Sequence, residues 1–363
     1  MNDVHGKPID HRIRWLAELA ERHGEAYRSP EAMLARTRYQ SRHPTAIAVL
    51  KCMDGRINIP FATETPVGIL MPFRNLGGQF DLGWPHLGEV LTQYVMERIH
   101  EGRQVVFLVT YHFSRGEPRR GCAGFGYDQT AAIAHTQAIR QQISTIFGEG
   151  HGTVYPLVCG FETDEDALII HGQDGRKLDM AAVTDTDLLQ LTHELGALLP
   201  DMPEKMRADL LPLLEGNVRH IAKVRAQAQQ GERLLDIEHR EWMICLGRGF
   251  DFLHTPNLAL IVGPYSPQLA EPIVRAAGII EANMAAGRIP DDGFLVLSSV
   301  PYESIGVDQA RAAMKASFLS RFAQQVIAEA HPALAKKMVS RTATLDWHAR
   351  RLGWLSDQSA NSS

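Results

Sequence analysis

Short apolar runs alternate with an amphipathic segment in the first third of the chain. The runs at 45–52 (TAIAVLKC), 67–74 (VGILMPFR) and 104–112 (QVVFLVTYH) are apolar at nearly every position. Runs of this length predict buried strands, and residues 86–103, before the third run, have the pattern of a helix. Strands that are apolar on both faces and separated by a helix indicate a mostly parallel α/β sheet, with functional residues at the strand ends.

The rest of the chain adds helices and two more strands. Ser29 followed by Pro30 marks the start of a second amphipathic helix within residues 9–42, so we expect a short N-terminal helical segment. The later pattern predicts a helix at 130–148, a strand pair joined by an acidic turn within 153–175, and helices within 183–233 interrupted by Pro200 and Pro203.

The same order of features occurs twice. Residues 94–114 and 277–303 each contain a helix, a Gly-Arg pair and a strand with Phe-Leu-Val. Upstream of each lies Thr-Pro followed by an apolar strand, and before that an apolar segment with a Cys. A repeated order of this kind predicts an internal duplication of one α/β unit.

The second copy lacks the polar residues of the first. Cys245 corresponds to Cys52 in this alignment, but no Asp follows it at the matching spacing. Ser299 takes the place of His112, and no Cys follows the third strand. We therefore expect the second unit to have kept the packing and lost the chemistry.

Composition and charge exclude several classes of protein. The chain has 363 residues, a hydrophobic content of 45% and a formal net charge of -5, without a basic face for nucleic acid or a polybasic anchor for a membrane. No run of eighteen apolar residues and no signal-peptide pattern occurs, so we expect a cytoplasmic protein. In a reducing compartment the four Cys are metal ligands, nucleophiles or buried side chains rather than disulfides.

Three of the potential metal ligands fall at predicted strand ends or in a loop that follows one. Cys52 ends the first strand, His112 ends the third, and Cys122 follows after nine residues. Two thiolates and one imidazole are a zinc-ligand set that leaves the fourth position open, as in catalytic zinc sites, where bound water has a pKa of about 7. The sequence therefore predicts a catalytic zinc site made of Cys52, His112 and Cys122.

An acidic and a basic residue, Asp54 and Arg56, follow Cys52 on the same turn. Arg56 can hold Asp54 ionised through a bidentate pair and leave it able to orient a water molecule. The alternative is that Asp54 itself binds the metal and closes the site. Arg74 and Asn75 have either a functional role or a purely structural one in a Gly-rich turn. Cys159 and Cys245 are expected to be structural.

These residues together resemble β-class carbonic anhydrases. That family carries Cys-x-Asp-x-Arg, here Cys52 to Arg56, an Arg-Asn-x-Gly-like turn, here from Arg74, and His-x-x-Cys, which is longer here between His112 and Cys122. The longer spacing and the second half without ligands are similar to the carboxysomal branch, formerly called ε-class, in which a fused degenerate repeat replaces one subunit of a dimer. The acidic hairpin ETDEDALIIH (162–171), with its turn at 162–166, fits that branch too.

The resemblance implies a fold, a reaction and a domain division. The fold is a β-carbonic-anhydrase-like, mostly parallel sheet with flanking helices, duplicated as an internal pseudo-dimer. The reaction is the reversible hydration of carbon dioxide to bicarbonate and a proton by zinc-bound hydroxide. We expect an N-terminal helical segment at 1–44, a catalytic zinc-binding domain at 45–236 and a degenerate repeat without zinc at 237–363.

Alternatives for function and partners stay open from sequence. The same zinc site could hydrolyse carbon disulfide or carbonyl sulfide, or the protein could be an inactive zinc-stabilised scaffold or regulatory binder. The N-terminal region is shorter than is usual for the carboxysomal branch, which favours a cytoplasmic location over a carboxysome. A homo-oligomer of the pseudo-dimers and an association with the carboxysome shell or Rubisco are further alternatives.

Overall fold

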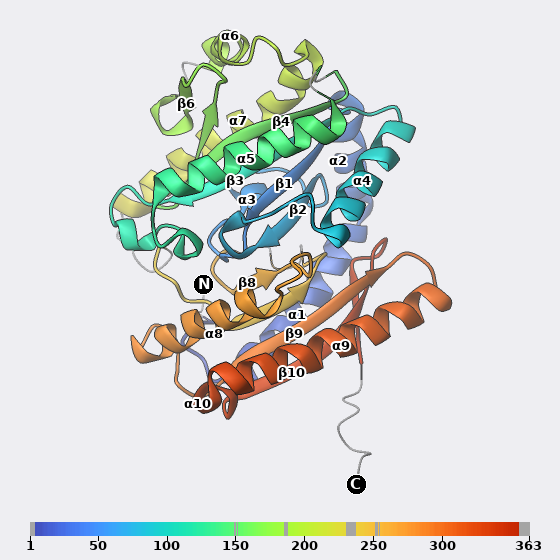
Figure 1. The fold of residues 1–363 in the computed structure, drawn as a ribbon, viewed down its shortest axis with the longest axis vertical. Helices are drawn as coiled ribbons and strands as arrows, with labels where there is room; N and C mark the ends of the chain where they lie inside the picture. Colours follow the sequence, from blue (N-terminus) through green and yellow to red (C-terminus); the bar gives the residue numbers. More distant parts are fainter. Residues whose placement is uncertain are drawn as a thin grey trace. The chain divides into compact units, whose positions relative to one another are not determined.

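The structure, a computed structural model, describes residues 4–148, 150, 152–184, 188–229, 237–250, 253 and 255–355. The chain divides into two compact units, one made of residues 34–238 and the other of residues 1–33 together with 239–363. Each unit has its own sheet and its own helices (Figure 1). Among the described residues no helix is both long and apolar enough to cross a membrane.

In the unit of residues 34–238, the described residues form a six-stranded sheet with the order β2-β1-β3-β4-β5-β6. The first four strands are parallel, and β5 and β6 are antiparallel additions at one edge. Their bounds are β1 Ala46–Cys52, β2 Leu70–Asn75, β3 Val105–Phe113, β4 Val154–Glu162, β5 Ala167–His171 and β6 Lys177–Asp179. Because β1 and β4 are buried along their whole length, they are apolar at almost every position, as predicted for strands covered on both faces.

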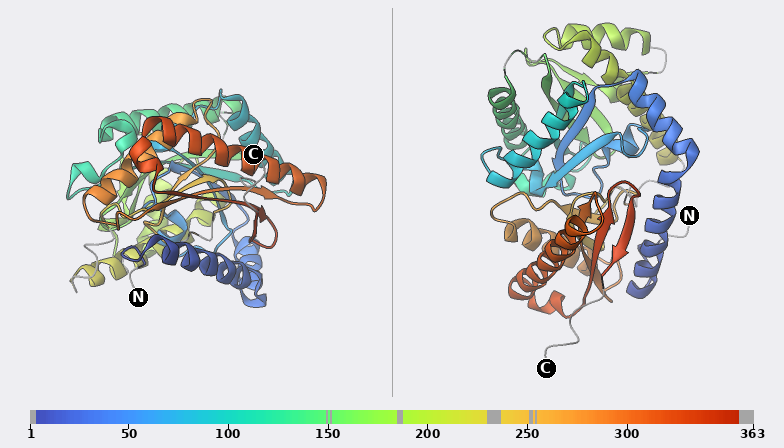
Figure 2. Two further views of the ribbon diagram at one scale, coloured as in Figure 1. Left: turned by 90° about the horizontal axis from the view of Figure 1, so that it is seen from below. Right: turned by 90° about the vertical axis from the view of Figure 1, so that its right-hand side faces the viewer.

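Helices cover both faces of this sheet. Helices α4 and α5 lie on one face and α7 lies on the other (Figures 1 and 2). Asp128 begins α5 by accepting hydrogen bonds from the backbone N–H groups of Thr130 and Ala131. The α-helices of this unit are α2 Pro30–Arg42, which starts before its boundary, α3 Ile59–Ala62, α4 Pro85–His100, α5 Gln129–Phe147, α6 Leu188–Leu198 and α7 Glu204–Gln229.

The predicted elements of this unit are present, with a few differences in extent. The second strand begins at Leu70 rather than at residue 67, because the backbone turns between Pro66 and Ile69, where Gly68 has a positive φ of 88°. The acidic turn joins β4 and β5 as predicted. Short α3 and β6 were not predicted, since their few residues carry no measurable periodicity.

The second unit repeats the strand order of the first. Its sheet has the order β11-β10-β9-β7-β8, in which β10, β9, β7 and β8 are parallel and β11 is antiparallel. This matches β5-β4-β3-β1-β2 strand for strand and supports the internal duplication. The bounds are β7 Met243–Gly247, β8 Ala259–Val262, β9 Phe294–Tyr302, β10 Met338–Asp346 and β11 Arg351–Trp354, with helices α8 Ala270–Ala285, α9 Val307–Ala330 and α10 Pro332–Ala335.

The strand register corrects the alignment of the two copies by one residue. Val109 and Val296 both end the repeated Phe-Leu-Val, and they lie opposite Leu50 and Ile244 respectively. Cys52 therefore corresponds to Leu246 and not to Cys245. Successive side chains of a strand alternate between faces. Cys245 therefore lies on the face of its sheet opposite to Leu246, the counterpart of Cys52.

Helix α1 (Ile9–Arg28) belongs to the second unit rather than to an independent N-terminal segment. It lies on the face of this sheet opposite α9 (Figure 2). The buried Arg12 donates to Asp292 at 2.6 Å and to the Gly293 carbonyl at 3.0 Å, and its guanidinium lies 5.2 Å from the Trp242 ring. The second sheet is thus covered on its other face by a segment from the start of the chain.

Candidate metal centre

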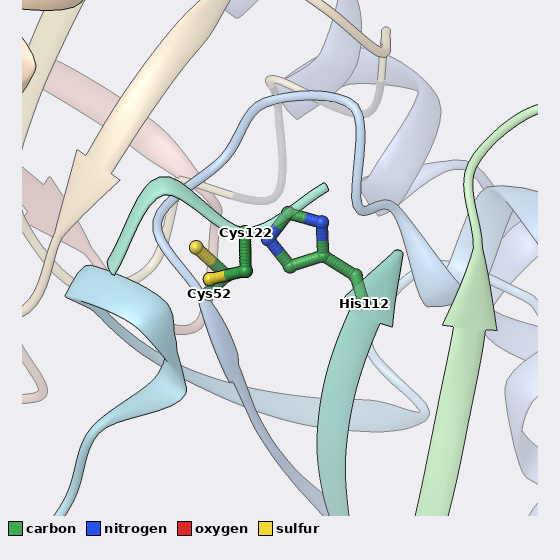
Figure 3. Close-up of side chains that lie close together, drawn as sticks. All are labelled: Cys52, His112 and Cys122. Carbon is green, nitrogen blue, oxygen red and sulfur yellow. The ribbon is translucent and has the colours of Figure 1, made fainter. Parts of the chain in front are cut away.

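The carboxyl ends of β1 and β3 bring Cys52 and His112 together, and the turn after β3 adds Cys122. Cys52 is the last residue of β1, His112 lies one residue before the end of β3, and Cys122 immediately precedes a short 3₁₀ turn at 123–125. One ligand atom from each residue lies within 4.8 Å of the others. Figure 3 shows the two sulfur atoms and the imidazole ring grouped together.

The three side chains fit a thiophilic metal ion. Their exposed fractions are 6% for Cys52, 3% for His112 and 3% for Cys122. Both ring nitrogens of His112 are buried and lack a hydrogen-bond partner among the described residues. A buried polar atom without a partner is unfavourable by about 1–3 kcal/mol, which a coordinated cation would remove. Two sulfurs and a nitrogen are donors that suit zinc in particular.

The two thiols influence each other's ionisation. Contact with Cys122, together with burial, raises the pKa of Cys52, and the same contact lowers the pKa of Cys122. The contact between the sulfurs therefore favours the proton on Cys52 and the negative charge on Cys122. A bound cation would take the place of that proton and stabilise both thiolates.

Asp54 and Arg56 form a buried pair beside Cys52, His112 and Cys122. Arg56 donates from Nε to Asp54 Oδ1 at 3.1 Å and from Nη2 to Oδ2 at 2.7 Å, and its backbone N–H also donates to Oδ1 at 2.9 Å. Asp54 Oδ2 lies 3.9 Å from His112 Nε2. The carboxylate is therefore held by Arg56 at the edge of the cluster, which favours the open arrangement over one in which Asp54 is a ligand.

Arg74 and Asn75 support the turn that carries Asp54. Arg74 donates to the Asp54 backbone carbonyl at 3.0 Å, and the Asn75 carbonyl accepts from the Met53 N–H at 2.8 Å. The Asn75 side chain donates to the Gln79 carbonyl at 2.7 Å. Both side chains therefore bind backbone carbonyl groups of the turns, which favours the architectural role for Arg74 and Asn75.

Glycines let three backbone segments approach one another at the site. Gly78 has a φ of 66°, and a Cβ there would lie 3.1 Å from the Thr110 carbonyl oxygen and 3.5 Å from the Cys52 nitrogen. A Cβ on Gly124 would lie 2.7 Å from the Gly77 Cα. The turns that follow β2 and Cys122 therefore pack against each other without intervening side chains.

The loop at 113–121, between His112 and Cys122, is held by acidic residues that sequence reasoning did not assign. Arg115 pairs with Asp179, and Arg120 pairs with Glu238 at 2.7 Å. Two of the loop arginines are thus paired with acidic side chains. Arg120 also lies 3.9 Å from Asp164 of the acidic turn at 162–166, which the sequence had indicated, and this contact depends on the pairing of β3 with β4.

The other two cysteines lie away from such ligands. Cys159 is buried in β4, and burial raises its pKa to about 12. Cys245 is buried in β7. Neither belongs to a cluster of potential metal ligands among the described residues, which agrees with a structural role for both.

A parallel α/β sheet with a buried Cys-His-Cys cluster at its strand ends is the architecture of a metal-dependent enzyme. Residues 45–198 match the family model described as the carboxysome shell carbonic anhydrase catalytic domain. This segment belongs to that family, and the protein is a carbonic anhydrase, that is, a carbonate dehydratase. The match spans β1 to α6 and contains every residue of the cluster. No curated protein matches the chain.

Proposed function

We propose that Cys52, His112 and Cys122 hold one Zn²⁺ ion and that this site hydrates carbon dioxide reversibly to bicarbonate and a proton. The observation that carries the proposal is the buried cluster of two sulfurs and an unpartnered imidazole beside a carboxylate held by Arg56. Bound zinc would supply a Lewis acid that lowers the pKa of water to about 7. The matched family supports the same reaction.

Asp54 has the geometry of an orienting hydrogen-bond acceptor. Arg56 donates twice to Oδ1, from Nε at 3.1 Å and from the backbone N–H at 2.9 Å, and once to Oδ2, from Nη2 at 2.7 Å. A carboxylate oxygen can accept two hydrogen bonds, so Oδ2 is the oxygen suited to bind the reacting water. Oδ2 is the oxygen that faces His112. In our proposal it accepts a hydrogen bond from the reacting water and directs the water's lone pair toward the carbon of carbon dioxide.

Arg56 keeps Asp54 ionised and fixed. Besides the carboxylate, Arg56 donates to the backbone carbonyls of Arg120 and Ile237, each at 2.9 Å. A guanidinium with this many partners has a single orientation, and its charge opposes protonation of the carboxylate. We propose that Arg56 acts through Asp54, without contacting the substrate.

The domain division and the location belong to the same proposal. Residues 45–236 would form the catalytic domain and 237–363 the repeat without zinc, since the residues aligned with Cys52 and His112 are Leu246 and Ser299. Carboxysome association is supported by the name of the matched family, and we propose it together with a homo-oligomer and contact with Rubisco. Size-exclusion chromatography with purified shell and Rubisco tests these partners.

Stopped-flow measurement of carbon dioxide hydration tests the reaction, with wild type beside Asp54→Asn at matched zinc content. Asparagine keeps the shape of the side chain and removes the charge. We expect wild type to be fast and the variant to lose roughly 100-fold or more in kcat, because the reacting water would no longer be oriented. Equal rates in the two proteins would refute the role of Asp54. Release of sulfide from carbonyl sulfide faster than hydration would instead select the other substrate.

A further inference from the structure

The loop at 113–121 between His112 and Cys122 is fixed by the acidic turn between β4 and β5. Asp164 accepts hydrogen bonds from the Ser114 hydroxyl, at 2.9 Å on either oxygen, and from the Gly116 N–H at 2.7 Å. The Thr163 N–H donates to the Phe113 carbonyl at 2.9 Å. The start of the loop is thus attached to the turn by both side-chain and backbone contacts.

Glu162, a buried residue, also connects the loop at 113–121 to the acidic turn. Its side chain is fully buried, at 0% exposure, and it lies opposite Phe113 in the pairing of β3 with β4. It accepts hydrogen bonds from the N–H groups of Arg115 and Asp164 at 3.1 Å and of Glu165 at 3.0 Å. One carboxylate therefore satisfies a donor of the loop and two donors of the turn.

The other end of the loop reaches the Asp54–Arg56 pair. The Arg120 carbonyl accepts a hydrogen bond from Arg56 Nη2 at 2.9 Å, the nitrogen that also binds Asp54 Oδ2. The Arg120 side chain lies 3.9 Å from Asp164. Cys122 follows two residues later. A continuous set of contacts therefore runs from the acidic turn through the loop to Arg56, and it ends two residues before Cys122.

We propose that Glu162 and Asp164 form a clamp that positions Cys122 and Arg56 for the reaction. A nine-residue connection would otherwise leave the sulfur of Cys122 free to sample many positions. Fixing the sulfur beforehand lowers the entropic cost of ordering it when the metal binds. The clamp acts through the loop, so Glu162 and Asp164 are positioning residues. The inference rests on the proposed metal site, because Cys122 is the ligand that the clamp holds.

Asp164→Asn tests the clamp, with Glu165→Gln as its matched control. Both changes remove one carboxylate from the same turn, but the Glu165 carboxylate binds Arg225 of α7, at 2.8 and 2.9 Å. Zinc affinity is measured by competition with a chelator. We expect Asp164→Asn to weaken it 10- to 100-fold, the usual range for residues that orient metal ligands, and Glu165→Gln to leave it unchanged.

A second readout uses the metal-free protein. The rate at which an alkylating reagent modifies Cys122, mapped by mass spectrometry, reports how firmly the loop holds the sulfur. Asp164→Asn should raise this rate several-fold, while the rate at Cys159 in β4 stays at its wild-type value. Ser114→Ala is the milder second variant in case Asp164→Asn does not fold. It removes the hydroxyl donor and should change both readouts in the same direction.

The outcomes separate this inference from the proposed function. If wild type binds zinc through Cys122 but Asp164→Asn and Ser114→Ala behave like Glu165→Gln, the clamp is refuted and the metal site stands. If wild type binds no zinc, the proposed function fails, and the alkylation rates still decide whether the acidic turn holds Cys122. Faster alkylation at Cys159 as well as at Cys122 would indicate general unfolding and would also refute a specific clamp.

Discussion

Arg56 is the residue on which the orientation of the candidate site depends most directly. It binds both oxygens of Asp54, the carbonyl of the loop and a carbonyl near the end of its own unit. A planar guanidinium can satisfy these acceptors together, whereas an ammonium group presents a single point of charge. The site therefore depends on the shape of the cation as well as on its charge.

Arg56→Lys should keep the charge and lose the geometry. We expect kcat for carbon dioxide hydration to fall about 100-fold while zinc affinity changes little, because none of the three ligands is altered. Arg225→Lys is the control, since Arg225 forms a similar two-point pair with Glu165 on the surface. A lysine variant with wild-type kcat would contradict a role for the bidentate pair.

His171 gives the catalytic unit a sensitivity to acid that is separate from the site. Burial, with a smaller effect from Lys177, lowers its pKa to about 4, and its Nε2 lies 2.8 Å from the Tyr111 hydroxyl. An unfolded His has a pKa near 6.5. Between these values the unfolded chain binds a proton that the folded chain does not, so stability is full above pH 6.5 and is lost as the pH falls toward 4.

His171→Gln removes this titration and keeps a polar partner for Tyr111. The free energy of unfolding, measured with urea, should fall in both proteins between pH 7 and pH 4.5. The fall should be roughly 1–2 kcal/mol smaller in the variant than in wild type. The control is His100→Gln, which changes a surface His at the end of α4. Its free energy of unfolding should fall by as much as that of wild type between the two pH values. An equal loss in His171→Gln and wild type would show that other groups carry the acid sensitivity.

At the scale of elements, the site is an assembly of strand ends and two glycine turns. The turn at 123–125 approaches the turn at 76–78 so closely that there is no room for a side chain on Gly124. Gln79 strengthens the contact by donating to the Gly124 carbonyl at 2.7 Å. The position of Cys122 is therefore set by packing of backbone on backbone as well as by its own loop.

Gly124→Ala should separate these two turns. We expect zinc affinity to fall at least 10-fold and the free energy of unfolding to fall by roughly 1–3 kcal/mol, the range for overpacking. Gly126→Ala is the comparison in the same turn, where a Cβ meets nothing within 4 Å and only the positive φ of 58° is unfavourable. It should lose about 1 kcal/mol of stability and keep its zinc affinity. Equal zinc affinities in the two variants would argue against the turn contact.

The sequence predicted the strands and the grouping of Cys52, His112 and Cys122, because both depend on local patterns. Apolar runs identify β1 and β3, and the ends of adjacent parallel strands meet, which places Cys52 near His112. The contacts of Asp164 were not predictable, since they arise from the pairing of β3 with β4, fifty residues away in sequence. The sequence alignment of Cys245 with Cys52 was wrong by one residue, because strand pairing sets the register and similarity of residues does not.

At the scale of the whole chain, two units share one strand order and differ in their chemistry. In the first unit the ends of β1 and β3 carry Cys52 and His112, and in the second the corresponding positions carry Leu246 and Ser299. Leucine and serine cannot replace a thiolate and an imidazole as zinc ligands. The duplication thus predicts a single metal site per chain, located in the unit of residues 34–238.

The most direct test of this account is the zinc content per chain together with carbon dioxide hydration, measured on wild type, Cys122→Ala and Cys245→Ala. We predict about one zinc per chain and full activity in wild type and in Cys245→Ala, and at least a 100-fold loss of activity with reduced zinc content in Cys122→Ala. Unchanged zinc content and hydration in Cys122→Ala would contradict the assignment of the metal site.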